Sequence, residues 1–136
     1  MKKTHILFLL CLTLLCSCAT RNYLNKTVWL NVTPVEKDGV KGNILTSVYF
    51  WDKNTVSFYT AVEKDNAIIV KPVLTASGNY NCKGNLKKGI EVMANMVSVK
   101  NETLQYKGFL IPEGMVLVSP DSTAKGYNII TDLTIK

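Results

Sequence analysis

Apolar and polar residues alternate with a period of two through most of the chain. The alternation is clearest in two neighbouring segments, 44–51 and 55–62, which the short polar stretch 52–54 separates. A period of two places successive side chains on opposite faces of a β-strand. The two segments and the stretch between them therefore predict a β-hairpin with a short turn.

Segments of this kind recur along the whole chain. They are rich in β-branched and aromatic residues and are separated by turn residues, as expected for short strands. We expect strands at 27–32, 44–51, 55–62, 67–74, 77–82, 90–99, 103–111, 115–118 and 127–135. The segment 90–99 also fits a helical stripe, but the strands on both sides of it favour a strand. Pro34 is expected to end the first strand, and Pro72 places the fourth near a sheet edge or a bulge.

Consecutive short strands without long crossovers predict an all-β fold of eight or nine antiparallel strands. An up-and-down barrel is favoured, because a closed sheet leaves no edge exposed, and a β-sandwich is the alternative. An eight-stranded barrel has an interior just wide enough for side chains or for one small ligand. If Phe50, Phe58, Met93 and Tyr106 all filled it, no ligand site would remain.

The first 17 residues have the features of an export signal. Lys2 and Lys3 precede an apolar run, 6–15, that is too short to cross about 30 Å of hydrocarbon. The run ends in Leu15-Cys16-Ser17-Cys18, which resembles the lipobox of bacterial lipoproteins. The resemblance implies cleavage between Ser17 and Cys18 and attachment of lipid to the Cys18 sulfur. Two or three long acyl chains would hold the protein on a membrane permanently.

These features divide the chain into three parts. Residues 1–17 are expected to be a signal peptide, 18–26 the lipidated N-terminus with a tether, and 27–136 a β-barrel domain. Ala19 follows the anchor, where an Asp would favour the inner membrane by the usual sorting rule of such lipoproteins. The resemblance therefore implies the outer membrane. No acidic run follows Cys18, which favours the periplasmic leaflet over the cell surface.

Charge and composition exclude several classes of function. Cleavage before Cys18 removes Lys2 and Lys3, so the formal net charge falls from +6 to +4. It also removes His5, which is the only histidine. Without an imidazole, the chain cannot build a Ser-His-Asp or Cys-His site, nor a zinc site of Cys and His. The acidic residues at predicted turns are expected to be solvated. We therefore expect no enzymatic activity, no metal and no cofactor.

The remaining basic and sulfur-containing residues are also uninformative about chemistry. The basic residues are spread along the chain without a patch, so nucleic acid is not an expected partner. Cys82 is the only cysteine after Cys18, which excludes an intramolecular disulfide in the mature chain. Because Cys82 shares a face with Tyr80 in the alternation, we expect it to be buried as a small apolar side chain.

The tryptophan on the first strand, the run of hairpins and the lipobox together resemble the small calycin-like, or lipocalin-like, lipoproteins of Gram-negative bacteria. The likeness covers 27–135 and includes Thr27-Val28-Trp29, which matches the Gly-x-Trp signature of lipocalins in its Trp but not in its Gly. It also includes the late hairpin around Tyr106 and Gly114. The resemblance implies a membrane-anchored barrel that binds a small apolar or amphipathic ligand, with Trp29 sealing one end.

Aromatic residues are the candidate contacts for a ligand or a partner. Those expected to contact a ligand inside the barrel are Trp29, Phe50, Phe58 and Tyr106, although simple core packing would explain them equally. Tyr49 and Tyr59 are expected to pair across strands on the outside. Trp51, at the hairpin tip, is a candidate anchor for a partner. The alternative function is therefore a protein-interaction or inhibitor module of the cell envelope that lacks a ligand cavity.

Overall fold

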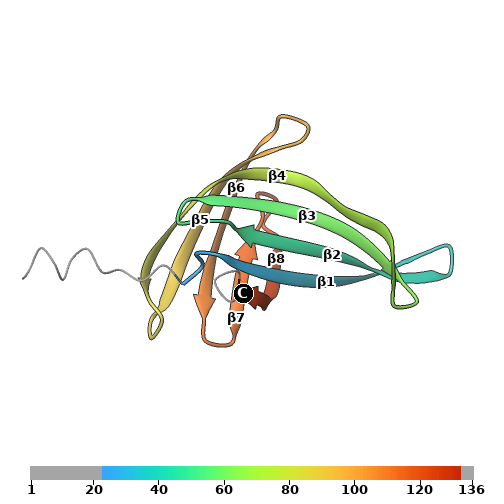
Figure 1. The fold of residues 1–136 in the computed structure, drawn as a ribbon, viewed down its shortest axis with the longest axis horizontal. Coiled ribbons are helices and arrows are strands. Elements are labelled where there is room, and N and C mark those ends of the chain that lie inside the picture. The colour runs from blue at the N-terminus through green and yellow to red at the C-terminus, as the bar shows by residue number, and fades with distance from the viewer. Residues whose placement is uncertain (1–22, 133–136) are drawn as a thin grey trace, which may run out of the picture.

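The computed structural model describes residues 23–132, with side chains up to residue 130. It contains eight strands: β1 (Thr27–Lys37), β2 (Val40–Phe50), β3 (Thr55–Lys64), β4 (Ala67–Asn85), β5 (Gly89–Ser98), β6 (Thr103–Ile111), β7 (Gly114–Val118) and β8 (Ala124–Asp132). Each strand pairs antiparallel with its neighbour in sequence, and β8 pairs with β1, which closes a barrel (Figure 1). The predicted up-and-down barrel is confirmed, its shape is compatible with a calycin-like fold, and the sandwich alternative is wrong. None of the residues described forms a helix that is long and apolar enough to cross a membrane.

The predicted strands are found, with two corrections. The ambiguous segment 90–99 is a strand, β5. The segments 67–74 and 77–82 are one continuous strand, β4, so the prediction of two strands is wrong. The strand pairs with β3 along its first part and with β5 from Ala76 onward, and it bends instead of turning. Gly78 lies in the overlap, where a Cβ atom would stand 2.1 Å from the Asn95 carbonyl oxygen. Only glycine permits this close approach of the two strands.

Two of the four prolines, Pro34 and Pro72, lie in parts of β1 and β4 that pair on one side only. The expectation that Pro34 ends the first strand is wrong, because β1 continues to Lys37 with Pro34 opposite Asn43. Beyond Leu30, β1 no longer pairs with β8, and an edge strand tolerates a missing N–H. Pro72 lies where the β3–β4 register shifts, as predicted for a bulge.

Successive turns of the barrel alternate between its two ends. The start of β1 and the β2–β3, β4–β5 and β6–β7 turns lie at one end, which we call the closed end. The four remaining turns lie at the other end, which we call the mouth. In Figure 1 the chain enters the barrel on the left, at the closed end, whereas the tips of the β1–β2 and β3–β4 hairpins lie on the right.

Buried side chains fill the barrel toward its closed end. The indole nitrogen of Trp29 donates a hydrogen bond to Thr27 Oγ1 (2.8 Å), and this hydroxyl donates to the Leu24 carbonyl oxygen (2.6 Å). The ring of Phe50 packs edge-on against that of Tyr80, with centroids 4.7 Å apart. The cluster contains Leu24, Trp29, Val48, Phe50, Val56, Phe58, Ala76, Tyr80, Ile90, Val92, Ala94, Met96, Leu110, Met115, Leu117 and Tyr127.

Not every side chain that could fill the barrel lies inside it. Phe50, Phe58 and Tyr106 are on its inner face, as the alternation predicted. Met93 alternates with the buried Val92 and Ala94 on β5 and lies on the outer face, so it is not one of the side chains that fill the interior. The condition under which no ligand site would remain is therefore not met in full.

Two hairpins extend beyond the closed part of the barrel. Because β1 pairs with β8 only as far as Leu30, and β4 pairs with β5 only from Ala76, residues 31–46 and 60–74 form a four-stranded extension with two free edges. We call it the projecting sheet. It continues the curvature of the barrel wall past the mouth (Figure 1).

Candidate ligand site at the mouth of the barrel

The four residues predicted to contact a ligand lie at two different depths. Trp29 and Phe50 are packed into the core at the closed end, where Trp29 is 6% exposed. Phe58 and Tyr106 lie nearer the mouth, and their rings meet across the interior with centroids 4.7 Å apart. These two side chains form the floor of a hollow that opens at the mouth.

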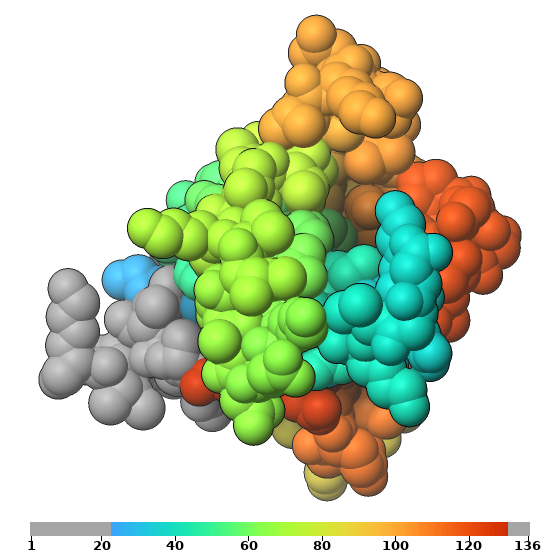
Figure 2. Space-filling model, turned by 90° about the vertical axis from the view of Figure 1, so that its right-hand side faces the viewer, coloured from blue at the N-terminus to red at the C-terminus, as the bar shows by residue number. Residues whose placement is uncertain are grey.

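The hollow has a volume of about 340 Å³. Hydroxyl-bearing side chains dominate its wall, together with one carboxylate and one ammonium group. It is lined by Thr46, Phe58, Thr60, Thr75, Tyr106, Leu117, Ser119, Asp121, Thr123, Lys125 and Tyr127. Figure 2 looks at the molecule from this end and shows the opening among the projecting sheet, the β5–β6 loop and the β7–β8 loop.

Several of these hydroxyl groups are available to a ligand. The Thr75 hydroxyl donates a hydrogen bond to the Phe58 carbonyl oxygen (3.1 Å). Within residues 23–132, no side-chain hydrogen bond satisfies the hydroxyls of Thr46, Thr60, Tyr106 or Tyr127. Groups of this kind at a partly enclosed site are satisfied by water or by a bound molecule.

The charged groups of the mouth have defined states. Asp121 accepts hydrogen bonds from the Ser119 hydroxyl and from the Thr123 backbone N–H, and these hold the pKa of its carboxyl below the usual value. Burial, with a smaller contribution from Asp121, raises the pKa of Tyr106. Burial and the nearby Tyr106 raise the pKa of Tyr127 to about 12. At neutral pH the mouth therefore presents an ionised carboxylate and two neutral phenols that can donate hydrogen bonds.

The inner face of the projecting sheet continues from the hollow and is largely apolar on β2, β3 and β4, whereas β1 places Asn31 and Thr33 on it. Along the inner face of β3, Thr60 at the mouth is followed by Val62, which pairs with Ile44 of β2 and with Val70 of β4. Directly opposite residues share a face of a sheet, so these side chains form one surface. A groove of about 490 Å³ lies along its far part. The groove has an apolar floor and a charged rim, and it is lined by Val35, Val40, Val62 and Ile69 with Lys37, Asp38, Lys41, Gly42, Glu63 and Lys64.

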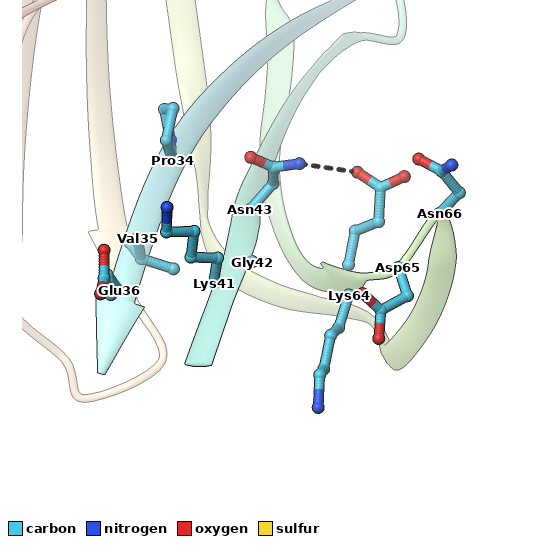
Figure 3. A pocket seen from close by; sticks show the side chains of 10 residues that line it. Pro34, Val35, Glu36, Lys41, Gly42, Asn43, Lys64, Asp65 and Asn66 are labelled. Carbon is cyan, nitrogen blue, oxygen red and sulfur yellow. Dashed lines mark hydrogen bonds between the residues drawn. The ribbon is translucent and has the colours of Figure 1, made fainter. Parts of the chain in front are cut away.

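A second groove opens toward the outer face of the projecting sheet, and it shares Val35, Lys41, Gly42, Glu63 and Lys64 with the first. It has a volume of about 510 Å³ and is lined largely by charged and polar residues, including Glu36, Lys41 and Asp65. Asn43 Nδ2 donates a hydrogen bond to Glu63 Oε2 (3.2 Å), and Figure 3 shows Lys64 extending away from this pair. The groove is larger than the hollow, but its charged groups do not converge on one point. It is therefore the weaker candidate for a ligand site.

Trp51 lies outside the barrel, beside the closed end. Its side chain is 41% exposed and stacks on Tyr49 with ring centroids 4.9 Å apart. Its indole nitrogen donates to Ser57 Oγ (3.1 Å). Tyr49 in turn meets Tyr59 edge-on at 5.1 Å, which confirms the expected cross-strand pair. We call Tyr49, Trp51 and Tyr59 the aromatic patch.

The remaining predicted sites give little further chemistry. Cys82 shares the inner face with Tyr80 as predicted, and it is a half-buried free thiol whose pKa burial raises to about 11. Residues 23–132 contain no cluster of three His, Cys, Asp or Glu side chains suited to a metal ion. Ser17 and Cys18 lie outside the residues that the structure describes.

Sequence reasoning missed most of the hollow. Thr46 and Thr60 are directly opposite each other on β2 and β3, and each interrupts an otherwise apolar inner face. This interruption at matching positions was the available signal. Asp121 and Lys125 gave no such signal, because their approach to Tyr106 and Tyr127 depends on how the β7–β8 loop folds over the mouth.

Comparisons of the chain with protein-family models, with curated proteins and with solved structures gave no match.

Proposed function

We propose that this protein is a lipid-anchored barrel of the cell envelope that binds a small amphipathic ligand at its mouth. The observation that supports this is the continuity between the hydroxyl-lined hollow and the apolar inner face of the projecting sheet. A polar head group would occupy the hollow, and an apolar chain would lie along the sheet. The ligand class is therefore amphipathic rather than purely apolar.

The volume of the hollow and the expected binding energies fit a ligand with a polar head group and an apolar chain. Ligand pockets commonly have volumes of roughly 300–1,000 Å³. The hollow, at about 340 Å³, suits a head group rather than a whole lipid. Each buried methylene contributes about 0.8 kcal/mol, whereas a net hydrogen bond contributes about 1 kcal/mol. The chain would therefore supply much of the affinity, and the hydroxyls would select the head group.

The test uses the unacylated mature chain, exported with a Cys18→Ser change. All strands and the buried cluster lie within residues 23–132, so this form keeps the complete barrel. A dansyl-labelled fatty acid serves as the fluorescent probe, and a monoacyl phospholipid serves as competitor. We expect the probe fluorescence to rise on binding and to fall when the competitor is added.

Two matched variants locate the binding surface. Val73 lies opposite Thr60 on the inner face and is 57% exposed, whereas Ile68 lies opposite Glu63 on the outer face and is 51% exposed. Val73→Asp should weaken probe binding by about tenfold, equivalent to about 1.4 kcal/mol. Ile68→Asp should leave it within about twofold. Equal effects of the two changes, or no binding of either lipid to the parent chain, would contradict the proposal.

The proposed anchor is Cys18, with 18–26 as tether and the periplasmic leaflet of the outer membrane as location. It is supported by the resemblance of residues 15–18 to a lipobox. Mass spectrometry of the mature protein should find an acylated Cys18 at the N-terminus, and Cys18→Ser should release the protein from membranes. A different mature N-terminus would argue against the anchor.

An alternative function is a protein-interaction or inhibitor module of the envelope. The exposed Trp51 of the aromatic patch favours it, because tryptophan is frequent among residues that dominate binding energy. In-cell photo-crosslinking from position 51 should then capture one defined protein. Loss of that protein with Trp51→Ala, together with unchanged lipid binding, would support this alternative.

A further inference from the structure

The closed end combines exposed aromatic residues with the point where the chain enters the barrel. Trp51 is exposed on the aromatic patch, and Tyr23, the first described residue, is also exposed. Leu24 is fully buried and fixes the start of the barrel beside them. Tryptophan and tyrosine are the residues that favour the head-group region of a bilayer, since they have both an apolar ring and a polar atom.

The same end is basic. Lys26 precedes β1, Lys53 lies in the β2–β3 loop, and Lys87 and Lys88 lie in the β4–β5 turn. The acidic residues of these turns are Asp52 and Glu113, and Asp132 ends β8 opposite Thr27 at the same end. Asp52 accepts hydrogen bonds from the backbone N–H groups of Asn54 and Thr55, so its charge is partly balanced locally.

At the mouth, each turn lysine has an acidic residue in the same turn. The β1–β2 turn contains Lys37 beside Asp38, the β3–β4 turn contains Lys64 beside Asp65, and the β5–β6 loop contains Lys100 near Glu102. At the closed end Lys53 likewise lies beside Asp52, whereas the β4–β5 turn contains Lys87 and Lys88 and no acidic residue. The clearest local excess of positive charge is therefore this turn of the closed end. A negatively charged surface would attract that end in preference to the mouth.

The length of chain between Cys18 and Tyr23 limits how far the closed end can lie from the bilayer. Four residues lie between Cys18 and Tyr23, and the five steps along the chain span at most about 18 Å at full extension. If Cys18 carries lipid, as proposed above, the closed end stays within this distance of the bilayer. The attraction of exposed lysines to anionic lipids acts over about 10 Å at moderate salt. A tether of this length therefore allows the basic turns to come within the range of this attraction.

We propose that the closed end docks directly on an anionic membrane surface. Trp51 enters the head-group region, and Lys26, Lys87 and Lys88 face the anionic lipids. The mouth and the projecting sheet then face away from the bilayer. The inference rests on the proposed anchor but not on the identity of the ligand at the mouth.

The test places the mature acylated protein in vesicles of phosphatidylcholine, with or without phosphatidylglycerol, that contain a phospholipid with a doxyl quencher near the head group. Its two described tryptophans differ in exposure, 41% for Trp51 and 6% for Trp29. We expect quenching in vesicles that contain phosphatidylglycerol and none in the Trp51→Phe variant, where only Trp29 emits. High salt should reduce the quenching.

A matched pair of charge reversals tests the orientation. Lys87→Glu with Lys88→Glu should lower the quenching at least threefold, whereas Lys37→Glu with Lys64→Glu, at the mouth, should leave it unchanged. An acylated protein whose Trp51 is not quenched would overturn the docking while leaving the anchor intact. An unmodified Cys18 would overturn the anchor and this orientation together. Crosslinking of position 51 to a protein, without quenching in vesicles, would assign the aromatic patch to a protein partner and also overturn the docking.

Discussion

The two ends of the barrel are built from the same eight strands but serve different purposes. At the closed end, inner positions hold Trp29, Phe50 and Tyr80, and a loop residue is tied to the core through a hydrogen bond from the Tyr80 hydroxyl to the Asp52 carbonyl oxygen (2.6 Å). At the mouth, equivalent inner positions hold Thr46 and Thr60. The difference teaches that the closed end supplies most of the stability and leaves the mouth free to be polar and hollow.

The two ends also differ in how their strand edges are protected. At the closed end, β1 pairs with β8 and no edge remains. The projecting sheet has two free edges, and each of these edge strands contains a proline, Pro34 in β1 and Pro72 in β4. Proline and lysine on an edge discourage further strand pairing, and Lys71 lies next to Pro72. The extension can therefore stay open without recruiting another chain.

The two ends should differ most in the free energy of unfolding that is lost when one apolar side chain at each end is shortened. Phe50→Ala removes a ring that is 1% exposed and should lower the free energy of unfolding by about 3–5 kcal/mol. Ile69→Ala, on the projecting sheet, should change it by less than about 0.5 kcal/mol, because Ile69 is exposed. Urea unfolding of the unacylated mature chain, followed by circular dichroism, measures both. Similar costs would show that the stability is not concentrated at the closed end.

A smaller effect is expected from a methyl group at a close approach of two strands. A Cβ atom on Gly108 of β6 would lie 1.9 Å from the Val116 carbonyl oxygen of β7. Gly108→Ala should therefore cost about 1–3 kcal/mol through backbone displacement. Gly126→Ala is the control, since no atom lies within 4 Å of the added carbon. A neutral Gly108→Ala in the same urea experiment would mean that the wall can shift without cost.

Removing one tyrosine hydroxyl at each end should distinguish a hydroxyl that stabilises the fold from one that is available to a ligand. Tyr80→Phe loses the hydrogen bond to the Asp52 carbonyl oxygen and should lower the free energy of unfolding by about 0.5–1.5 kcal/mol. Tyr127→Phe removes a hydroxyl for which residues 23–132 provide no hydrogen-bond partner, so it should be close to neutral. It should instead weaken binding of the lipid probe. The opposite ranking of the two stabilities would contradict this assignment.

High pH should destabilise both ends slightly. Burial raises the pKa of Cys82 from 9.0 to about 11 and that of Tyr127 from 10.0 to about 12. Both groups bind protons more tightly in the folded chain, so their contribution is complete below pH 9 and is lost as the pH rises toward 12. Because Cys82 is partly exposed, its loss by pH 10 should be at most about 1 kcal/mol. Cys82→Ala should flatten the stability profile between pH 9 and 11, and Tyr127→Phe between pH 10 and 12. A profile that neither change alters would rule out these two groups as its cause.

Alternation along the sequence predicted most of the barrel and little of the mouth. The bounds of β6 and the inward position of Phe50 and Phe58 follow from a period of two, which is a local property. The continuity of β4 does not, because Thr75, Ala76 and Ser77 have the composition of a turn and bend only through pairing with two different strands. The projecting sheet was also missed. Pro34 suggested an end to β1, whereas only closure of the barrel decides which parts of β1 and β4 lack a second partner.

The pairing of β1 with β8 has a consequence for the order of the chain. Thr27 lies opposite Asp132, so the start of β1 and the end of β8 lie side by side at the closed end. A short linker could join them there, and new termini could be opened in the β5–β6 loop without removing any strand pair. Such a circular permutant would keep the same barrel wall, but its tether would start at the mouth instead of the closed end. The hollow would then face toward the anchoring surface instead of away from it.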